Sequence, residues 1–406
     1  MAEAPWLTII GLGEDGPEGL SPAAREALAR AETVMGPERH LDLLPQDALA
    51  PGATCLVWPV PFADGLAQLE GLRGRATVVL ASGDPFHFGA GSVIARMLEP
   101  VEWRALPSLS VFSLIAARLG WPLERTLCRG LHAAPLSRLR ADLAPGRRLI
   151  VTLRDGAAVS ELALYLSGCG FGDSQLWVFE ALGGPREQVI EARADAMTGE
   201  FGHPVSVAIE VAGSGEVLPV VSGRPDETFA HDGQISKRPI RALALSALAP
   251  RPGERLWDIG SGSGSIALEW LLSDPACEAI SLERDPVRAG RISENAEALG
   301  VQRLEVQNVS APDGLDGLAA PDAVFIGGGL SEALLENLAE RLSPGTRLVA
   351  HAVTLSSEAL LSQWQAKLGG ALSRIEISEA APLAAGASAR LAWQAAYPIV
   401  QWRVVL

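Results

Sequence analysis

The 406-residue sequence has little of what metal centres, disulfide frameworks and membrane anchors require. Its four cysteines are scattered with no C-x-x-C spacing, which argues against zinc or disulfides and favours reduced thiols. No apolar run approaches the roughly 20 residues of a membrane-spanning helix, and no basic, apolar leader opens the chain. We therefore expect a cytoplasmic protein with no membrane partner and no metal site.

Basic charge is also scarce. The sequence has 33 Lys and Arg residues against 48 Asp and Glu residues, which gives a net charge of -15. A surface that holds a nucleic-acid backbone needs a positive field, so we expect no nucleic-acid partner. A small anionic substrate needs only a few local arginines and stays compatible with this charge. The hydrophobic share of 48% indicates folded rather than disordered material.

Short β-branched runs alternate with longer amphipathic runs rich in Ala and Leu, a pattern typical of α/β layers with largely parallel sheets. The clearest interruption is at 213–233, which is rich in Gly, Pro and acidic residues and which we interpret as a linker. It separates a domain at 1–212 from a domain at 234–406. A pause inside the first domain predicts two lobes, about 1–107 and 108–212, around a cleft.

Two strand candidates close the sequence, at 390–395 and 398–406, and only a short turn joins them. So short a connection predicts an antiparallel hairpin at the edge of the sheet. The rest of the second domain has the regular strand and helix alternation of a Rossmann-like α/β fold.

The strongest motif is the glycine-rich turn DIGSGSG at 258–264, between a predicted strand and a predicted helix. Without Cβ atoms its glycines allow a tight turn and the close approach of a ligand. The following helix N-terminus favours an anionic or carboxylate-bearing group. Glu283 ends the next predicted strand, where its carboxylate suits the two hydroxyls of a ribose. In such folds the ligand lies beyond the carboxyl ends of the strands.

Three kinds of site compete for this turn. A dinucleotide site needs G-x-G-x-x-G and a P-loop ends in Gly-Lys-Ser/Thr, and neither spacing is present. The third kind is the first motif of class I methyltransferases, which the turn resembles closely. The stretches DGQISKRPIRALALSAL, LWDIGSGSGSIALEW and PDAVFIGGG resemble, further, the decarboxylating C15-methyltransferases of cobalamin synthesis over 231–406.

This resemblance implies a Rossmann-like class I methyltransferase fold that binds S-adenosylmethionine. The glycines would line its methionine part, Glu283 would hold the ribose and Arg284 would flank the adenine. The implied cofactor residues are Gln234, Asp258, Gly260, Gly262, Gly264, Glu283, Arg284, Asn308, Val309 and Gly327. The Asn/Asp-Pro-Pro-aromatic motif of nucleic-acid amino-group methyltransferases is absent, which disfavours that activity.

Candidate catalytic residues of this half are His351 and Arg241. His351 opens HAVTL, which also matches the family, although Asn is commoner there. Arg241 is one of four candidates to bind substrate carboxylates, together with Arg238, Arg288 and Arg291. A solvated helix charge is the alternative for each arginine.

In the first half, Gly11 follows the first predicted strand and Gly83-Asp84-Pro85 follows a later one. Binding loops of open α/β sheets lie at such strand ends, although Gly-Asp-Pro alone is a common turn. With IIGLGEDGPEGLSPAAREALARAETVMG, LASGDPFHFGAG, PSLSVFSLIAARLGWP and FEALGGPRE, these residues resemble class III tetrapyrrole methylases over 5–212. Within that group they most resemble the C5-methyltransferases of cobalamin synthesis.

The second resemblance implies the two-lobed class III tetrapyrrole-methylase fold with its own S-adenosylmethionine in the cleft, and thus one cofactor site per domain. The implied cofactor residues are Gly11, Gly83, Asp84, Pro85, Ser113, Leu153 and Leu182. Asp84 is also a candidate catalytic residue. His87 is a candidate substrate contact, with a structural role as the alternative.

Together the resemblances imply a bifunctional enzyme of cobalamin biosynthesis whose substrate is a precorrin tetrapyrrole. It would methylate C5 in the first domain and C15 in the second, and decarboxylate the ring C acetate with the macrocycle as electron sink. We also expect a homo-oligomer. The alternatives are an RNA methyltransferase, which the acidic balance opposes, and a non-catalytic cofactor sensor, which would need no substrate cleft.

Overall fold

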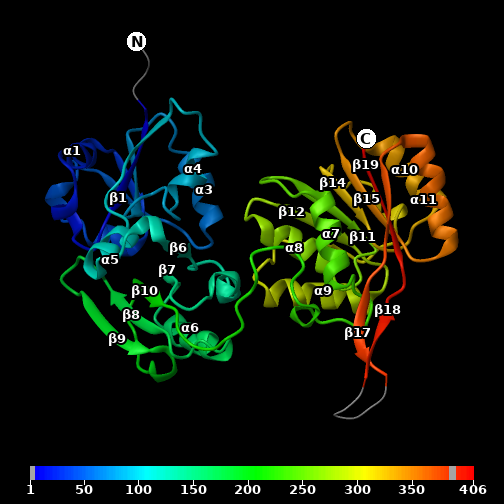
Figure 1. Cartoon of the computed structure of the whole chain (residues 1–406). Coiled ribbons are helices and arrows are strands. Elements are labelled where there is room, and N and C mark those ends of the chain that lie inside the picture. The colour runs from blue at the N-terminus through cyan, green and yellow to red at the C-terminus, as the bar shows by residue number, and fades with distance from the viewer. Residues whose placement is uncertain (1–4, 384–389) are drawn as a thin grey trace. The chain divides into compact units, whose positions relative to one another are not determined.

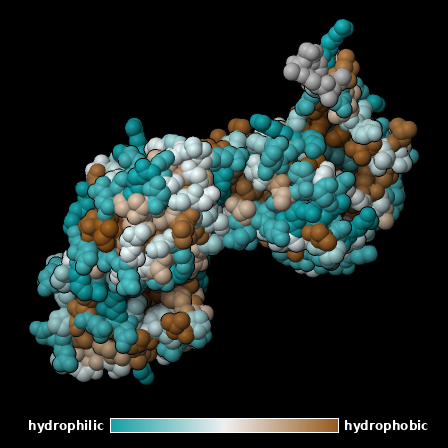
Figure 2. Space-filling model, turned by 90° about the horizontal axis from the view of Figure 1, so that it is seen from below, coloured by the Kyte–Doolittle hydropathy of each residue, from teal (hydrophilic) through white to brown (hydrophobic). Residues whose placement is uncertain are grey.

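The computed structural model describes residues 5–383 and 390–406. The chain forms two compact units, Met1–Leu136 with Leu143–Glu216, and Ser137–Asp142 with Val217–Leu406. The face drawn in Figure 2 is mostly hydrophilic, with its hydrophobic residues in small separate groups. Over the described residues, no helix is long and apolar enough to cross a membrane.

A parallel five-stranded sheet, in the order β3-β2-β4-β1-β5, opens the first unit. Its strands are β1 (Leu7–Leu12), β2 (Thr33–Gly36), β3 (Thr54–Val57), β4 (Thr77–Ser82) and β5 (Trp103–Leu106). The covering helices are α1 (Pro22–Arg30) on one face, and α3 (Phe62–Glu70) and α4 (Gly91–Ala95) on the other. Because both faces are covered, every residue of β1 is buried.

The second sheet of this unit has the order β6-β7-β10-β8-β9. Its strands are β6 (Thr126–Gly130), β7 (Arg148–Thr152), β8 (Gln175–Glu180), β9 (Gln188–Arg193) and β10 (Val205–Glu210), accompanied by α5 (Val111–Leu119) and α6 (Ala157–Gly168). Only β6 and β7 pair in parallel. The prediction of largely parallel sheets is therefore wrong for this lobe. The connection between β8 and β9, at 181–187, is too short for a parallel crossover.

The second unit is a three-layer α/β fold around a seven-stranded sheet in the order β13-β12-β11-β14-β15-β19-β16. Its strands are β11 (Arg255–Ile259), β12 (Glu278–Leu282), β13 (Glu305–Gln307), β14 (Ala323–Ile326), β15 (Arg347–Ala352), β16 (Ala371–Ile375) and β19 (Ile399–Val405). One face packs on α7 (Arg238–Leu248), α8 (Ser265–Ser273) and α9 (Pro286–Ala298), and the other on α10 (Glu332–Arg341) and α11 (Leu355–Leu368) (Figure 1). The Rossmann-like prediction is confirmed.

The closing strands do not pair as predicted. β18 (Leu391–Ala395) pairs with β17 (Ser378–Pro382) in a separate two-stranded sheet. β19 lies between β15 and β16, antiparallel to both. The antiparallel edge is therefore confirmed, but β16 and β19 form it, and the predicted hairpin between 390–395 and 398–406 is wrong. A strand's hydrophobic alternation shows which face is buried and not which strand lies beside it.

Most of the segment interpreted as a linker belongs to the second unit. From Val217 on, the chain packs with that unit, and Leu218 and Phe229 are buried in the core that contains α7 and α8. The composition of the segment suggested a linker, because most of its residues are Gly, Pro or acidic. Two apolar residues are nevertheless enough to anchor it to the core of the second unit.

Candidate active sites

The glycine-rich turn of the second unit connects β11 to α8 at the carboxyl ends of the parallel strands. Gly260, Gly262 and Gly264 have φ values of 67°, 59° and 76°, in the left-handed region that favours glycine. A Cβ on Gly260 would lie 2.6 Å from the carbonyl oxygen of Gly328, and one on Gly264 would lie 2.8 Å from the side chain of Ile292. The turn therefore needs glycine for its backbone angles and for space.

Glu283 follows β12 and turns its carboxylate to the glycine-rich turn. Its Oε2 accepts a hydrogen bond from the N–H of Gly262 at 2.8 Å, and its Oε1 accepts one from the N–H of Asp285 at 3.0 Å. The side-chain amide of Asn308 donates to the carbonyl of Glu283 at 2.8 Å. The structure thus brings these predicted residues together where β11, β12 and β13 end.

The remaining predicted residues of this set lie at the same end of the sheet. The carbonyl oxygen of Gln234 lies 3.0 Å from where a Cβ on Gly262 would be. The N–H of Gly327 donates a hydrogen bond to the carbonyl of Ile259, the last residue of β11, at 2.9 Å. Arg284 is exposed beside Glu283, and Val309 is partly buried against the core.

Asp258 is completely buried at the end of β11. Its Oδ2 accepts a hydrogen bond from the N–H of Ala267 at 3.2 Å, whereas Oδ1 has no partner among the residues that the structure describes. Burial raises the pKa of Asp258 to about 7. An unpartnered buried acceptor beside a glycine turn and a second carboxylate fits a ligand with an ammonium group and sugar hydroxyls, as S-adenosylmethionine has.

His351 lies at the carboxyl end of β15. Its Nε2 is 2.9 Å from Oε1 of Gln401 on β19, and its ring meets that of Phe325 edge-on with centroids 5.0 Å apart. Strand register puts Asp258, Phe325 and His351 on the face of the sheet that packs on α7 and α8. Burial lowers the pKa of His351, so the imidazole is neutral at neutral pH.

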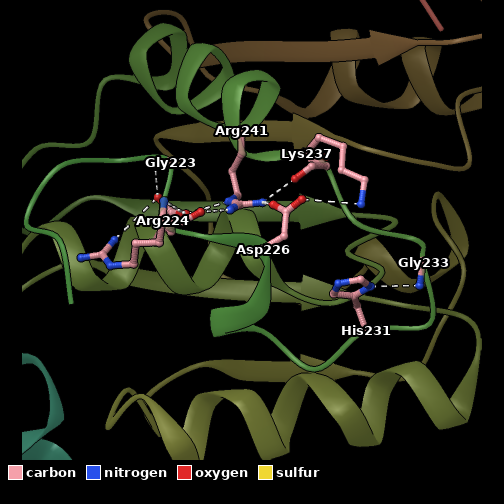
Figure 3. A network of polar contacts seen from close by, with 9 residues as sticks. Gly223, Arg224, Asp226, His231, Gly233, Lys237 and Arg241 are labelled. Atoms are coloured by element: carbon pink, nitrogen blue, oxygen red, sulfur yellow. Dashed lines mark hydrogen bonds and ion pairs between the residues drawn. The ribbon is translucent and has the colours of Figure 1, made fainter. Parts of the chain in front are cut away.

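Arg241 is enclosed in the interior of the second unit. The side chain is completely buried, and its guanidinium binds only groups of this chain in the network of Figure 3. Nε donates to Glu269 at 2.6 Å and Nη1 to Asp226 at 3.0 Å, and the carbonyls of Ser236 and Arg224 accept further hydrogen bonds. The prediction of a catalytic or carboxylate-binding Arg241 is therefore wrong, because Arg241 lies on the inner face of α7.

Two of the other candidate arginines also bind a carboxylate of the chain. Nε of Arg288 lies 2.9 Å and Nη1 of Arg291 lies 3.4 Å from Oδ2 of Asp232. Both arginines keep part of their side chains exposed. Arg238 is exposed in the first turn of α7.

In the first unit, three loops meet at the carboxyl ends of β1, β4 and β5. The N–H of Gly83 donates to the carbonyl of Leu12 at 3.0 Å, and the N–H of Ser108 donates to the carbonyl of Gly83 at 3.1 Å. A Cβ on Gly11 would lie 1.8 Å from the oxygen of Gly83. Gly11 and Ser108 also line a cavity of about 370 Å³. The two predicted glycines therefore lie in close contact, and Gly11 also lines the cavity.

The other predicted residues of this unit differ in how far their side chains could contact a ligand. The carboxylate of Asp84 accepts a hydrogen bond from the N–H of Phe86 at 2.9 Å, which closes a tight turn around Pro85. The hydroxyl of Ser113 lies 3.1 Å from that of Ser110 at the start of α5. Leu153 and Leu182 are buried. These leucines can offer a ligand little more than their backbone.

His87 belongs to an aromatic group that follows Asp84. Its ring lies 4.4 Å from that of Phe112 and 5.2 Å from that of Phe88. Phe86 and Phe88 are both exposed, and Phe88 has a φ of 59°. A left-handed non-glycine residue is rare outside functional sites and tight turns. The group therefore places a strained, partly exposed aromatic surface beside the Gly83 loop.

The sequence did not reveal the ion-pair network around the buried carboxylate of Glu14 in the first unit. Glu14 is 7% exposed and accepts hydrogen bonds from Arg39 and, at 3.2 Å, from Arg186. Arg39 also donates to the hydroxyl of Ser82 at 3.1 Å. Burial, with the nearby Arg186, lowers the pKa of Arg39 to about 10. These residues are far apart in the sequence, and no motif connects them.

Comparisons with known proteins cover both units. A family model for tetrapyrrole (corrin/porphyrin) methylases matches residues 6–198, and one for a precorrin methyltransferase domain matches residues 227–406. A precorrin-6Y C(5,15)-methyltransferase (decarboxylating) of Sinorhizobium is 47% identical over 403 residues, which are 98% of this chain and 96% of that protein.

Two shorter relatives come from Salmonella typhimurium. A cobalt-precorrin-6B C(15)-methyltransferase (decarboxylating) is 34% identical over 128 residues, which are 30% of this chain and 66% of that protein. A cobalt-precorrin-7 C(5)-methyltransferase is 25% identical over 195 residues, which are 48% of this chain and 94% of that protein. The chain belongs to the decarboxylating precorrin-6Y C5,15-methyltransferases of cobalamin biosynthesis, enzymes that methylate a precorrin at C5 and C15 and decarboxylate it.

Proposed function

We propose that the first unit methylates C5 and that the second unit methylates C15 and decarboxylates the ring C acetate. The observation that carries this division is that each unit has its own glycine-lined loops at the carboxyl ends of parallel strands. The similarity to separate C5- and C15-methyltransferases supports it.

We propose one S-adenosylmethionine site in each unit. In the second unit Glu283 would hold the ribose hydroxyls, the glycine-rich turn would line the methionine part, and Oδ1 of Asp258 would accept a hydrogen bond from the ammonium group. In the first unit Gly11, near the end of β1, and the loop of Gly83 would form the floor of the site. When bound, the cofactor supplies an electrophilic methyl group.

In both methylations the chain would hold the substrate carbon in line with the methyl group that is transferred, and would exclude water from the site. For the decarboxylation, the bond between the carboxyl carbon and the methylene carbon breaks and carbon dioxide leaves. The electron pair of that bond enters the conjugated macrocycle, which makes C15 electron-rich. A desolvated site favours this loss, because a carboxylate is stabilised by water.

We place His351 beside the macrocycle in the second unit, as the donor or acceptor of one hydrogen bond. The hydrogen bond to Gln401 and the contact with Phe325 fix its ring. His351→Asn, which keeps a donor and an acceptor, should retain most C15 methylation, whereas His351→Leu should lower kcat. Equal activity of the two variants would remove His351 from the site.

The division of activities is tested with the full-length protein and one disabled site. Glu283→Ala removes the carboxylate that would hold the ribose, so the cofactor KM of the second site should rise by about 10- to 100-fold. At a cofactor concentration below the raised KM, mass spectrometry of the product should then show the C5 methyl group gained and the C15 methyl group missing. Loss of C5 methylation with intact decarboxylation would overturn the division.

We propose that the protein forms a homo-oligomer through the β17–β18 sheet. Among residues 5–383 and 390–406, these strands pair with each other alone. Leu391, Trp393 and Tyr397, in and after β18, are 65%, 78% and 91% exposed. Exposed apolar groups of this kind mark interaction surfaces. Trp393→Lys should lower the mass measured by sedimentation without loss of folding, and an unchanged mass would exclude this surface.

The partner set proposed for the enzyme is a precorrin and no nucleic acid, in keeping with its net charge of -15. A filter-binding assay with RNA of mixed sequence tests the second part, and saturable binding at physiological salt would contradict it. The cytoplasmic location stays a prediction.

A further inference from the structure

A segment at 230–236, called here the cover segment, runs beside the glycine-rich turn of the second unit. The carbonyl oxygen of Gln234 lies 3.0 Å from where a Cβ on Gly262 would be. The cover segment belongs to no helix or strand and leads directly into α7, as Figure 3 shows around Gly233 and Lys237. Its position therefore depends on contacts with side chains rather than on a backbone ladder.

Asn295 on α9 binds the cover segment and the glycine-rich turn at the same time. Its Oδ1 accepts a hydrogen bond from the N–H of Ala230 at 2.8 Å, and its Nδ2 donates to the carbonyls of Ala230 and Ser263, each at 3.0 Å. Asn295 is 4% exposed. A side-chain amide supplies the acceptor and the two donors that this position uses.

Asp232 anchors the middle of the cover segment to the same helix. Its Oδ1 accepts a hydrogen bond from the N–H of Gln234 at 3.1 Å. Its Oδ2 lies 2.9 Å from Nε of Arg288 and 3.4 Å from Nη1 of Arg291. These contacts lower the pKa of Asp232 to about 2, with the hydrogen bond from Arg288 as the largest cause. The cover segment is thus tied to α9 at a buried point and at an exposed one.

We propose that Asn295 and Asp232 are positioning residues for C15 methylation, because they hold the cover segment as a wall of the methyl-donor site. This inference rests on the cofactor site proposed for the second unit. Neither residue contacts the reacting atoms, and both act through the cover segment and the glycine-rich turn. Release of the segment weakens cofactor binding equally in the ground and transition states, so KM rises while kcat stays the same.

The most informative variant is Asn295→Asp. The new side chain has the same size and keeps the acceptor for the N–H of Ala230, but it places an oxygen against the carbonyls of Ala230 and Ser263. In the full-length enzyme we expect the S-adenosylmethionine KM of C15 methylation to rise at least about tenfold. The kcat of that reaction and the KM of C5 methylation should stay unchanged. Asn337→Ala is the matched control, because Asn337 on α10 accepts a hydrogen bond from Arg341 at 3.2 Å.

Asp232→Asn separates positioning from folding. Asp232 has a side chain that is 35% exposed, so its replacement leaves the core of the unit intact. We expect the same KM to rise by about two- to fivefold, because partly exposed ion pairs are weak. The thermal midpoint of the variant should match that of the wild type. If Asn295→Asp does not fold, Asp232→Asn alone tests whether the cover segment positions the cofactor.

An unchanged C15 KM in Asp232→Asn and in a folded Asn295→Asp, or a fall in kcat alone, would overturn the positioning role. Failure of the proposed cofactor site has a different signature, because Glu283→Ala would then leave the C15 KM unchanged as well. Binding of S-adenosylhomocysteine, measured by calorimetry on the same proteins, gives a readout that does not depend on the precorrin. The affinity for S-adenosylhomocysteine should fall by the same factor as the KM for S-adenosylmethionine rises.

Discussion

Nε of Arg241 lies 2.6 Å from Oε1 of Glu269, and neither side chain is exposed to solvent. The pair joins α7 to α8, and Glu269 also accepts the N–H groups of Gly223 and Arg224, at 2.7 Å and 3.0 Å. The carboxylate therefore ties the chain that enters the second unit to two of its helices. A buried carboxylate that loses a cation is poorly compensated, and here Nη1 of Arg224, 3.6 Å from Oε2 of Glu269, would remain beside it.

Arg241→Met should lower the free energy of unfolding of the second unit by about 3–5 kcal/mol, because Glu269 would remain charged in the interior. Addition of Glu269→Gln should restore part of that loss, since the amide is uncharged. Denaturant titration followed by circular dichroism measures both. An unchanged unfolding curve with lost C15 methylation would return Arg241 to the list of catalytic candidates.

Gly11→Ala should abolish C5 methylation and leave C15 methylation intact. Its Cβ would lie 1.8 Å from the oxygen of Gly83 and 2.6 Å from the nitrogen of Ser108, and neither backbone atom can move without opening the site. Gly13→Ala is the control, because the one atom closer than 3 Å to its Cβ would be Oδ1 of the Asp15 side chain, at 2.4 Å, and that side chain can rotate away. Product mass spectrometry distinguishes the two reactions. Full C5 methylation by Gly11→Ala would show that the three loops are not the site.

Asp258 should make the second unit less stable as the pH rises. Its folded pKa is raised to about 7, whereas an unfolded Asp has a pKa of about 3.9. Between these values the native state keeps a proton that the unfolded state has released, so the free energy of unfolding falls as the pH rises. The fall ends above the folded pKa.

Asp258→Asn cannot ionise and should not show this dependence. The difference in free energy of unfolding between variant and wild type should shift in favour of the variant from pH 5 to pH 8. Urea titrations of both full-length proteins at several pH values measure this difference, when the unfolding transition of the second unit is followed. Parallel pH curves would mean that Asp258 is ionised throughout this range.

A fragment that begins at residue 217 should fold, whereas one that begins at residue 234 should not. The shorter fragment lacks Leu218 and Phe229 from the core, and it lacks the backbone groups of Gly223 and Arg224 that bind Glu269. Cooperative thermal unfolding of each fragment is the measurement. Equal midpoints would show that the segment before 234 contributes nothing to the second unit.

Residues that belong to a local motif could be predicted from the sequence. Gly262 and Glu283 lie on successive strand ends, and parallel strands bring such ends together. Arg241 could not be placed, because a helix position does not show whether a charge faces solvent or a buried partner on another helix. Asn295 carries no motif, and its importance depends on Ala230 and Ser263, which only the folded chain brings near it.

The position of β19 between β15 and β16 has a consequence for synthesis of the chain. In the part of the chain that the structure describes, β16 pairs with β19 alone, so residues 371–375 have no partner in the sheet until residues 399–405 have left the ribosome. The first unit has all of its residues by 216 and can fold while the rest is still being made. The second unit exposes an open strand edge for longer. The unpaired edge is therefore covered only when synthesis of β19 is complete.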